Sequence, residues 1–457
     1  MSELSLLDHY KQNKPVTRGR LGHLTASETA KLQQLWQKLI CEFDDNKAPL
    51  PVRFPLLQQQ DDESTDMASL SMGPQVSPSS KDSKPASETK PSGGWFGWAS
   101  GSGASTPVSG ASTPVPLDMS EEAVRQRTET VQQHVRRTQS RDVQPEGFVP
   151  LFGQPADTRT LRAGFWQAAT QALDPDAYVL RFLRARKWDV DAALVMLLKT
   201  VEWRVAQAID EVAYYGEAAL HYHTMESGLA FACMTDRLRN PVYVVRVRVN
   251  IARNRNILAI RRFLCWQIES AQLLTRQSDG CVTILFDLTG FSKENIDIKL
   301  VRTLITLLTA YYPETLGILI LHVNSWVFSG IWQLIQPFID PAVKEKIVFA
   351  KGAADIAQYI DMDELIEEVG GNKPFCYKYV PPQSDENKRM QDMESRRVCE
   401  AALEHAVNQY ESATREWVET GTAPEGRTQA RDAVLEAASS LDPYVRAHTL
   451  YHRVGFV

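Results

Sequence analysis

The sequence has no long apolar run, few cysteines and no excess of positive charge. No stretch approaches the ~20 apolar residues of a membrane-spanning helix, and the first residues, MSELSLLDHYKQNK, carry charges where a signal peptide has an apolar core. The six cysteines are scattered without a CxxC pair, which argues against disulfides and a structural zinc site. The net charge of −6 gives no global footprint for nucleic acid. We therefore expect a soluble, intracellular protein that does not bind nucleic acid.

The common motifs of catalysis are missing as well. The sequence has no G-x-S-x-G nucleophile motif, no G-x-x-x-x-G-K-[ST] phosphate loop and no complete G-x-G-x-x-G. His221 and His223 are a candidate metal pair, but the sequence places no third ligand, so a surface or capping role is the better interpretation. Asp287 follows an apolar strand and resembles a catalytic carboxylate, although capping of the turn in FDLTG explains it better. We expect no catalytic residues, no bound metal and no cofactor.

A strong apolar pattern runs from Cys281 to Lys351. It predicts two short strands, Val282–Phe286 and Ile318–Val323, with a helix at Ile298–Ala310 between them. Continuous apolar strands joined through a helix are typical of a buried parallel sheet. The other elements predicted nearby are strands at 229–234 and 242–249 and a long helix at 256–275. The fold class is therefore α/β, with a mixed sheet and helices packed against it.

Helical segments flank this α/β domain on both sides. The N-terminal segment contains one amphipathic helix, from about Ser27, its predicted cap, to Phe43. A small helical lobe follows later in the chain, where Asp174 and Asp189 are predicted to start its second and third helices. Two further helical patterns form a C-terminal extension. The predicted segments are the N-terminal segment 1–57, a linker 58–158, the helical lobe 159–215, the α/β domain 216–382 and the extension 383–457.

The linker is rich in Ser, Pro, Gly and Thr and has few aliphatic residues. Such a segment buries too little apolar surface to offset the entropy of ordering, so we expect most of it to be disordered. Its one aromatic island, Trp95–Trp98, is open to three interpretations: insertion at a bilayer interface, docking on the folded domain, or service as a peptide ligand. Thr106 and Thr113 each precede a proline and are candidate sites for a proline-directed kinase.

A short segment after the second strand is apolar on more than one face. A surface helix normally has one apolar stripe, so a helix of this kind is an ordinary core helix, or it covers an apolar space on one side and touches an apolar phase on the other. Its neighbouring breaks, at Gly330 and Asp340-Pro341, are places at which such a helix pivots. The residues are Phe328, Ile331, Trp332, Ile335, Phe338 and Ile339.

Four motifs in a fixed order carry a family resemblance. They are FLRARKW at Phe182–Trp188, FDLTGF at Phe286–Phe291, YYPETLG at Tyr311–Gly317 and PFIDPAVKEKI at Pro337–Ile347. This order and spacing resembles the CRAL-TRIO lipid-binding family, and most of all its fungal phosphatidylinositol transfer proteins. The resemblance implies a CRAL-TRIO lipid-binding domain with a hydrophobic pocket and a gating helix, preceded by a helical lobe.

The resemblance also implies which residues hold the headgroup. In the phosphatidylinositol-binding members, the second arginine of FLRAR, the glutamate of YYPE and the lysine after the gate contact it, and the matching residues are Arg186, Glu314 and Lys346. A cation suits a phosphodiester and a carboxylate accepts from ring hydroxyls. The alternatives are a structural ion pair for Arg186 and Glu314 and a surface position for Lys346. Thr283 is a candidate phosphate contact, while Val343 stands where the family has a gate threonine.

Lipid carriage has a clear physical purpose. A two-chain phospholipid exposes roughly thirty methylenes in water, and at ~0.8 kcal/mol each this costs on the order of 20 kcal/mol. By resemblance we expect a monomer that carries phosphatidylinositol between membranes, touches membrane surfaces transiently and supplies a lipid kinase. We expect it in the cytoplasm, with peripheral association to endoplasmic reticulum, endosome or lipid droplet. A sterol, squalene-like or other isoprenoid lipid is an alternative ligand. A non-catalytic scaffold or small-GTPase regulator is an alternative of another class.

Overall fold

The computed structural model describes residues 5–50, 159–171, 174–207, 209–220, 222–250, 257–275, 280–323, 332–333 and 336–457. By their contacts, all of these residues belong to one unit, Met1–Gln58 with Thr128–Val457. The predicted linker at 58–158, with Trp95–Trp98, Thr106 and Thr113, lies outside the described residues.

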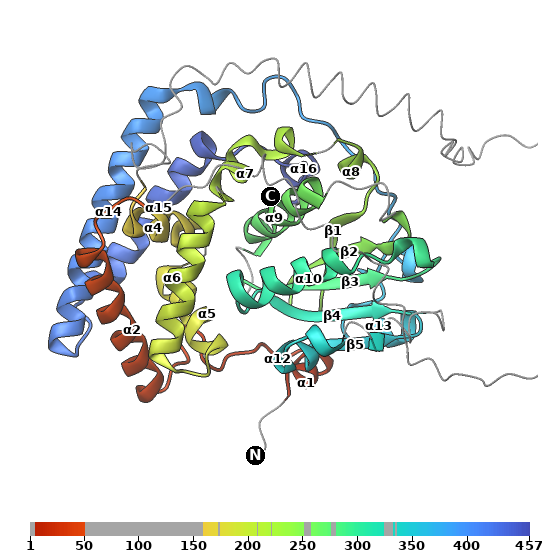
Figure 1. Ribbon diagram of the computed structural model, residues 1–457, viewed down its shortest axis with the longest axis horizontal. Coiled ribbons are helices and arrows are strands. Elements are labelled where there is room, and N and C mark those ends of the chain that lie inside the picture. Colours follow the sequence, from red (N-terminus) through yellow and green to blue (C-terminus); the bar gives the residue numbers. More distant parts are fainter. Residues whose placement is uncertain are drawn as a thin grey trace, which may run out of the picture. The chain divides into compact units, whose positions relative to one another are not determined.

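Five strands form one sheet in the order β1-β2-β3-β4-β5 (Figure 1). β1 pairs antiparallel with β2, whereas β2, β3, β4 and β5 run parallel to one another. The mixed sheet predicted from the apolar runs is therefore confirmed. Their bounds are β1 Ala230–Thr235, β2 Pro241–Arg246, β3 Val282–Asp287, β4 Leu316–His322 and β5 Ile347–Ala350.

The α-helices of the described residues surround this sheet and extend beyond it. They are α1 Leu6–Lys11, α2 Ala26–Asp45, α4 Leu161–Gln171, α5 Pro175–Ala185, α6 Val190–Ala206, α7 Ile209–Tyr215, α8 Tyr222–Glu226, α9 Ile257–Leu274, α10 Ile298–Thr306, α12 Pro341–Lys344, α13 Ala353–Ile356, α14 Met393–Thr420, α15 Gly426–Val445 and α16 Leu450–Arg453. Short 3₁₀ helices occur at Gly216–Ala219, Val247–Val249, Lys293–Asn295, Gln336–Phe338, Glu367–Val369 and Lys388–Gln391, and a π-helical turn, Leu307–Tyr311, continues α10. Among these described helices, none has both the length and the apolar character that a bilayer crossing requires.

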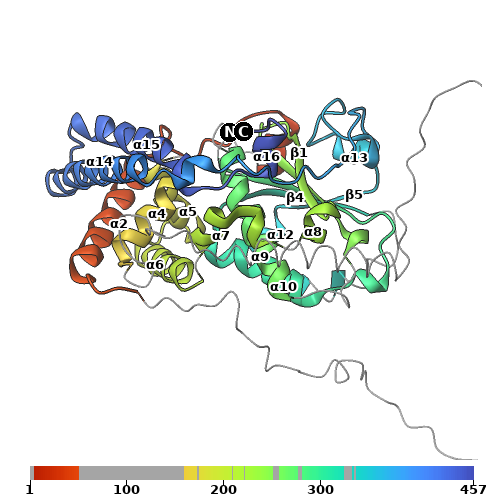
Figure 2. The ribbon, with the colours of Figure 1, turned by 90° about the horizontal axis from the view of Figure 1, so that it is seen from above.

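Different helices cover the two faces of the sheet. α9 and α10 lie on one side of the strands and α13 lies on the other (Figure 2). α1 joins α13, because Tyr10 is buried in the same cluster as Ile356. Side chains alternate along a strand, so Val282 and Ile284 of β3 face α9 whereas Leu285 faces α1 and α13. Each face of the sheet therefore has its own apolar core.

The lobe of α4, α5 and α6 forms as predicted. Asp174 caps α5 and Asp189 caps α6, each through its side chain. The predicted cap of α2 was wrong. Thr25, not Ser27, accepts from the backbone N–H of Glu28, whose side chain in turn accepts from the N–H of Thr25. This reciprocal capping box satisfies two N–H groups at once, which a cap at Ser27 cannot do with Glu28.

The helices α2, α14 and α15 pack on this lobe, and Figure 1 shows them gathered beside α4, α5 and α6. One buried carboxylate, Asp176 of α5, ties them together. It accepts hydrogen bonds from Trp36 Nε1 at 2.6 Å, Tyr410 Oη at 2.8 Å and Arg427 Nη1 at 2.7 Å. The last helix reaches the other core, where Tyr451 packs with the sheet and α9. The C-terminal extension thus contributes to the core of the helical lobe and to the core between the sheet and α9.

Replacing Asp174 with asparagine is expected to stabilise the protein above about pH 6. Burial, together with the nearby charge of Asp176, raises the pKa of Asp174 to about 6. Because the folded state holds this proton more tightly than the unfolded state, its contribution to stability is present at low pH and is lost as the pH rises through 6. Asparagine keeps the helix cap without the charge. Urea unfolding should show a gain of about 1 kcal/mol or more at pH 8 and a much smaller one at pH 4. A variant less stable than the wild type at pH 8 would contradict this assignment.

Candidate ligand-binding site

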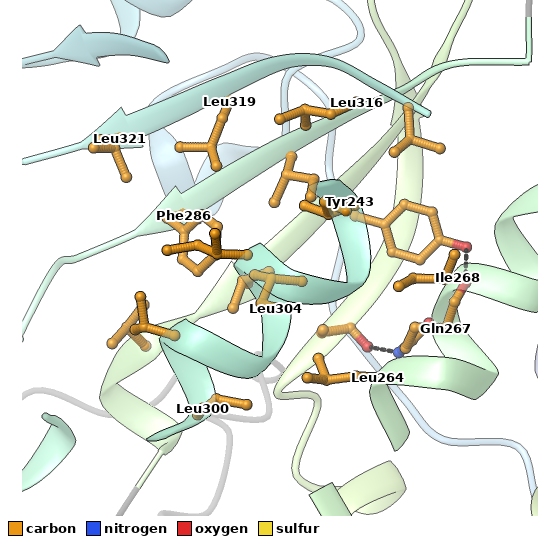
Figure 3. Close-up of a pocket in the computed structure, with 18 of the residues that line it drawn as sticks. Tyr243, Leu264, Gln267, Ile268, Phe286, Leu300, Leu304, Leu316, Leu319 and Leu321 are labelled. Atoms are coloured by element: carbon orange, nitrogen blue, oxygen red, sulfur yellow. Dashed lines mark hydrogen bonds between the residues drawn. The ribbon is translucent and has the colours of Figure 1, made fainter. Parts of the chain in front are cut away.

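A cavity of about 240 Å³ lies between the sheet and the helices α9 and α10. Figure 3 shows its wall: Leu316 and Leu319 come from β4, and Leu300 and Leu304 project from α10. The sequence produces this space because β4 alternates its side chains and α10 carries a leucine stripe at helical spacing. An engineered apolar cavity of about 150 Å³ already takes up benzene. The cavity described here is therefore large enough for an apolar molecule.

Several polar atoms in the wall are already used by neighbouring groups, whereas Oδ1 of Asn250 is buried without a hydrogen-bond partner among the described residues. Gln267 Nε2 donates to the carbonyl of Ala230 at 2.6 Å, and its Oε1 accepts from Tyr451 Oη at 3.0 Å. Asp297, the one charged residue among the described lining residues, caps α10 by accepting from the N–H of Leu300. A ligand in this part of the cavity is therefore held by contacts between apolar groups.

The predicted gate lies mostly outside the described residues. This applies to Phe328, Ile331 and Ile335, and to the side chain of Phe338. The remaining two residues do line the cavity. Trp332 and Ile339 are both in its wall, and the Trp332 ring lies 5.0 Å from that of Phe349 on β5. Phe349 is half exposed. The gating helix itself stays a prediction.

The structure brings Glu314 and Lys346 together. Lys346 Nζ lies 3.7 Å from Glu314 Oε2 and donates to the carbonyl of Leu316 at 2.9 Å. The two residues precede β4 and β5, whose first residues meet at the same edge of the sheet because these strands run parallel. Thr315 and Leu316 line the cavity. The ion pair therefore marks one end of the apolar space.

Arg186, the third predicted headgroup residue, is exposed where α5 ends. None of its described contacts is with Glu314 or Lys346. Two other arginines of α5, Arg181 and Arg184, interact electrostatically with Glu314. Burial lowers the pKa of both Arg181 and Arg184, and the Glu314 carboxylate acts in the opposite direction. The spacing of these two arginines, which puts them on one helix face, is the signal that the motif comparison missed.

Arg20 is a third cation at this place, and it comes from the chain between α1 and α2. It donates to Cys281 Sγ at 3.3 Å, and its charge helps to lower the pKa of Arg184. No local pattern marks Arg20 in the sequence, because Cys281 and Arg184, the side chains that it meets here, lie more than 150 residues away.

Thr283 does not meet the expectation of a phosphate contact. It sits on β3 between Val282 and Ile284, which face the cavity, so its own side chain points to the opposite face. There it is fully buried and donates to Asp236 Oδ2 at 2.7 Å. Thr283 is part of the core under α1.

Asp287 has the turn-capping role that the sequence favoured. Its Oδ1 accepts from the N–H of Thr289 at 3.0 Å, and it pairs with Arg248. Burial opposes ionisation, but hydrogen bonds from His322, Thr289 and Arg248 outweigh it and hold the pKa of Asp287 at about 2. Of the two candidate metal-binding histidines, His223 lies 3.8 Å from Glu226, and His221 is outside the described residues.

Two family models match this chain. The CRAL/TRIO domain model matches residues 225–371, and the model of the CRAL/TRIO N-terminal domain matches residues 128–199. A CRAL-TRIO domain-containing protein of Schizosaccharomyces pombe is 32% identical over 310 residues, which are 66% of this chain and 70% of that protein. The phosphatidylinositol transfer protein CSR1 of Eremothecium gossypii is 31% identical over 292 residues, covering 61% of this chain and 67% of that protein.

More distant matches include the Sec14 cytosolic factor of Schizosaccharomyces pombe, which is 27% identical over 227 residues and covers 44% of this chain and 76% of that protein. Among solved structures, the crystal structure of Sfh5 aligns with 53% of this chain and 85% of its own, at 16% identity and a TM-score of 0.36.

Proposed function

The chain belongs to the CRAL-TRIO family of lipid-binding proteins, and from this we propose that it binds phosphatidylinositol and exchanges it between membranes. The observation that carries the proposal is the apolar cavity with an ion pair, Glu314 and Lys346, at one end. An amphiphile needs these two environments side by side. Its chains enter the apolar space, and its headgroup meets a carboxylate and an ammonium group.

This activity requires no covalent chemistry, so we propose that the protein is not an enzyme and uses no cofactor. One of its relatives is named a phosphatidylinositol transfer protein. We infer that the lipid is released at membrane surfaces and that a lipid kinase phosphorylates the headgroup of the delivered lipid. Association with the membrane is then transient and peripheral, and a single copy of the chain suffices.

An isoprenoid or sterol is the second candidate ligand, and the size of the cavity favours it. A volume of about 240 Å³ is less than twice that of the engineered cavity that takes up benzene, whereas two acyl chains carry roughly thirty methylenes. Phosphatidylinositol therefore requires the cavity to widen, with α10 moving outward from the sheet. A single elongated apolar molecule requires a smaller change. Extraction and mass spectrometry of lipid from the native protein distinguish the two.

Replacing both Glu314 and Lys346 with alanine is expected to lower phosphatidylinositol exchange between vesicles about tenfold or more. Each residue offers one charge-assisted hydrogen bond to the headgroup, worth roughly 1.5–3 kcal/mol when it is lost. Exchange of a fluorescent phosphatidylinositol between donor and acceptor vesicles measures the effect, and circular dichroism checks the fold.

The chain offers a matched control for this variant. Lys373 Nζ lies 3.0 Å from Glu364 and donates to the carbonyl of Cys233, so it repeats the contacts of Lys346 away from the cavity. Alanine at both control positions should leave exchange unchanged. Equal rates in the two double variants would remove the headgroup assignment. Absence of phosphatidylinositol exchange in the wild type, with an isoprenoid in the extract, would remove the proposed function.

A further inference from the structure

Three arginines meet where β3 begins, beside the Glu314–Lys346 pair. Arg181 Nη2 donates to the carbonyl of Gly280 at 3.2 Å, and Arg184 Nη1 donates to the carbonyl of Gly19 at 2.9 Å. Arg20 donates to Cys281 Sγ. The guanidinium groups of α5 thus bond to neutral carbonyl oxygens, although guanidinium is the side chain best suited to pair with an anion. Within the described part of the chain, Nε of Arg184 is buried without a hydrogen-bond partner.

The segment that brings Arg20 to this place is firmly seated. Gly19 has φ +67°, and a Cβ there would lie 2.9 Å from the Trp188 ring and 3.2 Å from Cδ of Arg184. Only glycine fits so close to α5. Nearer the start of the same segment, Tyr10 is buried and its hydroxyl accepts from Asn240 at 3.2 Å. Contacts at both ends hold the segment, which we call the N-terminal strap (residues 5–24), so Arg20 is positioned by the fold.

The electrostatics of this cluster favour an anion. Burial, followed by repulsion from Arg20, lowers the pKa of Arg184 to about 9, and the same two effects lower the pKa of Arg181. Like charges in a half-buried place destabilise one another. The carboxylate that opposes both shifts is Glu314, and Lys346 already lies 3.7 Å from it. One carboxylate therefore faces more than one cation, and a bound anion would relieve the repulsion.

We propose that Arg20, Arg181 and Arg184 form a binding site for a phosphomonoester, carried either on the ring of a phosphorylated inositol lipid or on a free inositol phosphate. A phosphodiester has one negative charge, whereas a phosphomonoester has about −1.5 to −2 at pH 7 and three acceptor oxygens. Planar guanidinium groups match such a group with paired hydrogen bonds. The site adjoins the proposed headgroup position, because Gly280 lines the cavity and Glu314 interacts with two of the arginines. The inference rests on the proposed function and extends it to the phosphorylation state of the headgroup.

The test compares the wild type with Arg20→Gln, Arg184→Gln in one chain. Flotation with phosphatidylcholine vesicles doped with a phosphatidylinositol monophosphate measures lipid binding, and calorimetry with soluble inositol trisphosphate and with inorganic phosphate measures the free anions. The double variant should bind the monophosphate lipid at least about tenfold more weakly, because two charge-assisted contacts are lost. Exchange of unphosphorylated phosphatidylinositol should change less than about twofold, since the Glu314–Lys346 pair is intact.

Two further variants separate binding from folding. Arg18→Gln changes an exposed arginine of the same strap and should bind both lipids like the wild type. Lysine at positions 20 and 184 keeps the charge without the planar fork, so it should recover part of the lost affinity. Inositol trisphosphate should also raise the thermal unfolding midpoint of the wild type and not that of the glutamine variant.

Each outcome decides the inference. Selective loss of the monophosphate lipid supports a lipid ligand, and binding of inositol trisphosphate without the vesicles supports a free one. Equal loss of both lipids in the glutamine variant would assign the arginines to the phosphodiester or to the fold, and would overturn the proposal. So would a wild type that binds no phosphomonoester while exchanging phosphatidylinositol normally. Failure of all exchange in the wild type refutes the proposed function instead.

Discussion

Replacing Leu319 with tryptophan is expected to lower lipid exchange between vesicles at least about tenfold while the fold stays intact. Leu319 lies on the sheet face of the cavity and is incompletely buried by its neighbours (Figure 3). The larger ring fills space that the ligand needs. Displacing even two methylenes of a chain removes about 1.6 kcal/mol of binding, which is more than a factor of ten in affinity.

The tryptophan variant separates a ligand cavity from an ordinary packing defect. If the space is a defect, filling it should raise stability and leave exchange alone, because cavities destabilise in proportion to their volume. The control is Val398→Trp, on α14, where the side chain is 67% exposed. This variant should exchange lipid like the wild type. Normal exchange by the Leu319 variant, with a raised unfolding midpoint, would mean that lipid does not use this cavity.

Replacing Arg204 with methionine is expected to destabilise the protein by about 3–5 kcal/mol. Arg204 Nη1 lies 2.8 Å from Glu269 Oε1, and Nη2 lies 2.9 Å from Asp210 Oδ1. All three side chains are at most 4% exposed. Methionine fills most of the space of the arginine side chain but removes its charge. The buried Glu269 carboxylate then keeps only the hydrogen bond from the hydroxyl of Tyr312 among the described residues. Urea unfolding followed by tryptophan fluorescence measures the loss of free energy.

An exposed ion pair provides the comparison for this variant. Arg415 and Asp44 join α14 to α2 at 2.8 Å, with side chains 41% and 53% exposed. Arg415→Met should cost at most about 1 kcal/mol, because water screens the pair. A similar small cost for both variants would show that the Arg204 network contributes little to joining the lobe to α9. The expected difference also predicts that salt weakens the exposed pair and leaves the buried one unchanged.

Local signals in the sequence predicted the elements well. The helices α5 and α6 begin at their aspartate caps, and the apolar runs became β3 and β4 of the parallel sheet. The cap of α2 was misassigned because Thr25, Ser27 and Thr29 compete over five residues, and only the capping box selects Thr25. Thr283 was misplaced for a simpler reason. Period-two alternation assigns it to the face opposite Val282 once Val282 faces the cavity.

The cationic cluster shows where sequence reasoning ends. Glu314 and Lys346 come from motifs of the family, and the structure does place them side by side. Arg184 lies in such a motif and Arg181 just before it. Their position on one helix face indicates a site only when the group that this face meets is known. Arg20 donates to Cys281 just before β3, and the carbonyl of Gly19 beside it accepts from Arg184 on α5, both far along the chain. Tertiary contact alone identifies it, and no periodicity in the N-terminal segment indicates it.

The packing of Trp36 against Tyr410 has a consequence for how the protein is made in the cell. Trp36 is fully buried, with its ring 5.7 Å from that of Tyr410 on α14. At about 5–20 residues per second, the roughly 370 residues between them take on the order of 20–70 s to leave the ribosome. The helices α4, α5 and α6, which also pack on α2, leave the ribosome earlier, so throughout that time only the face of α2 toward α14 lacks its partner. Nascent chains should therefore expose this face of α2 until α14 is complete, which makes it a contact for a chaperone during synthesis.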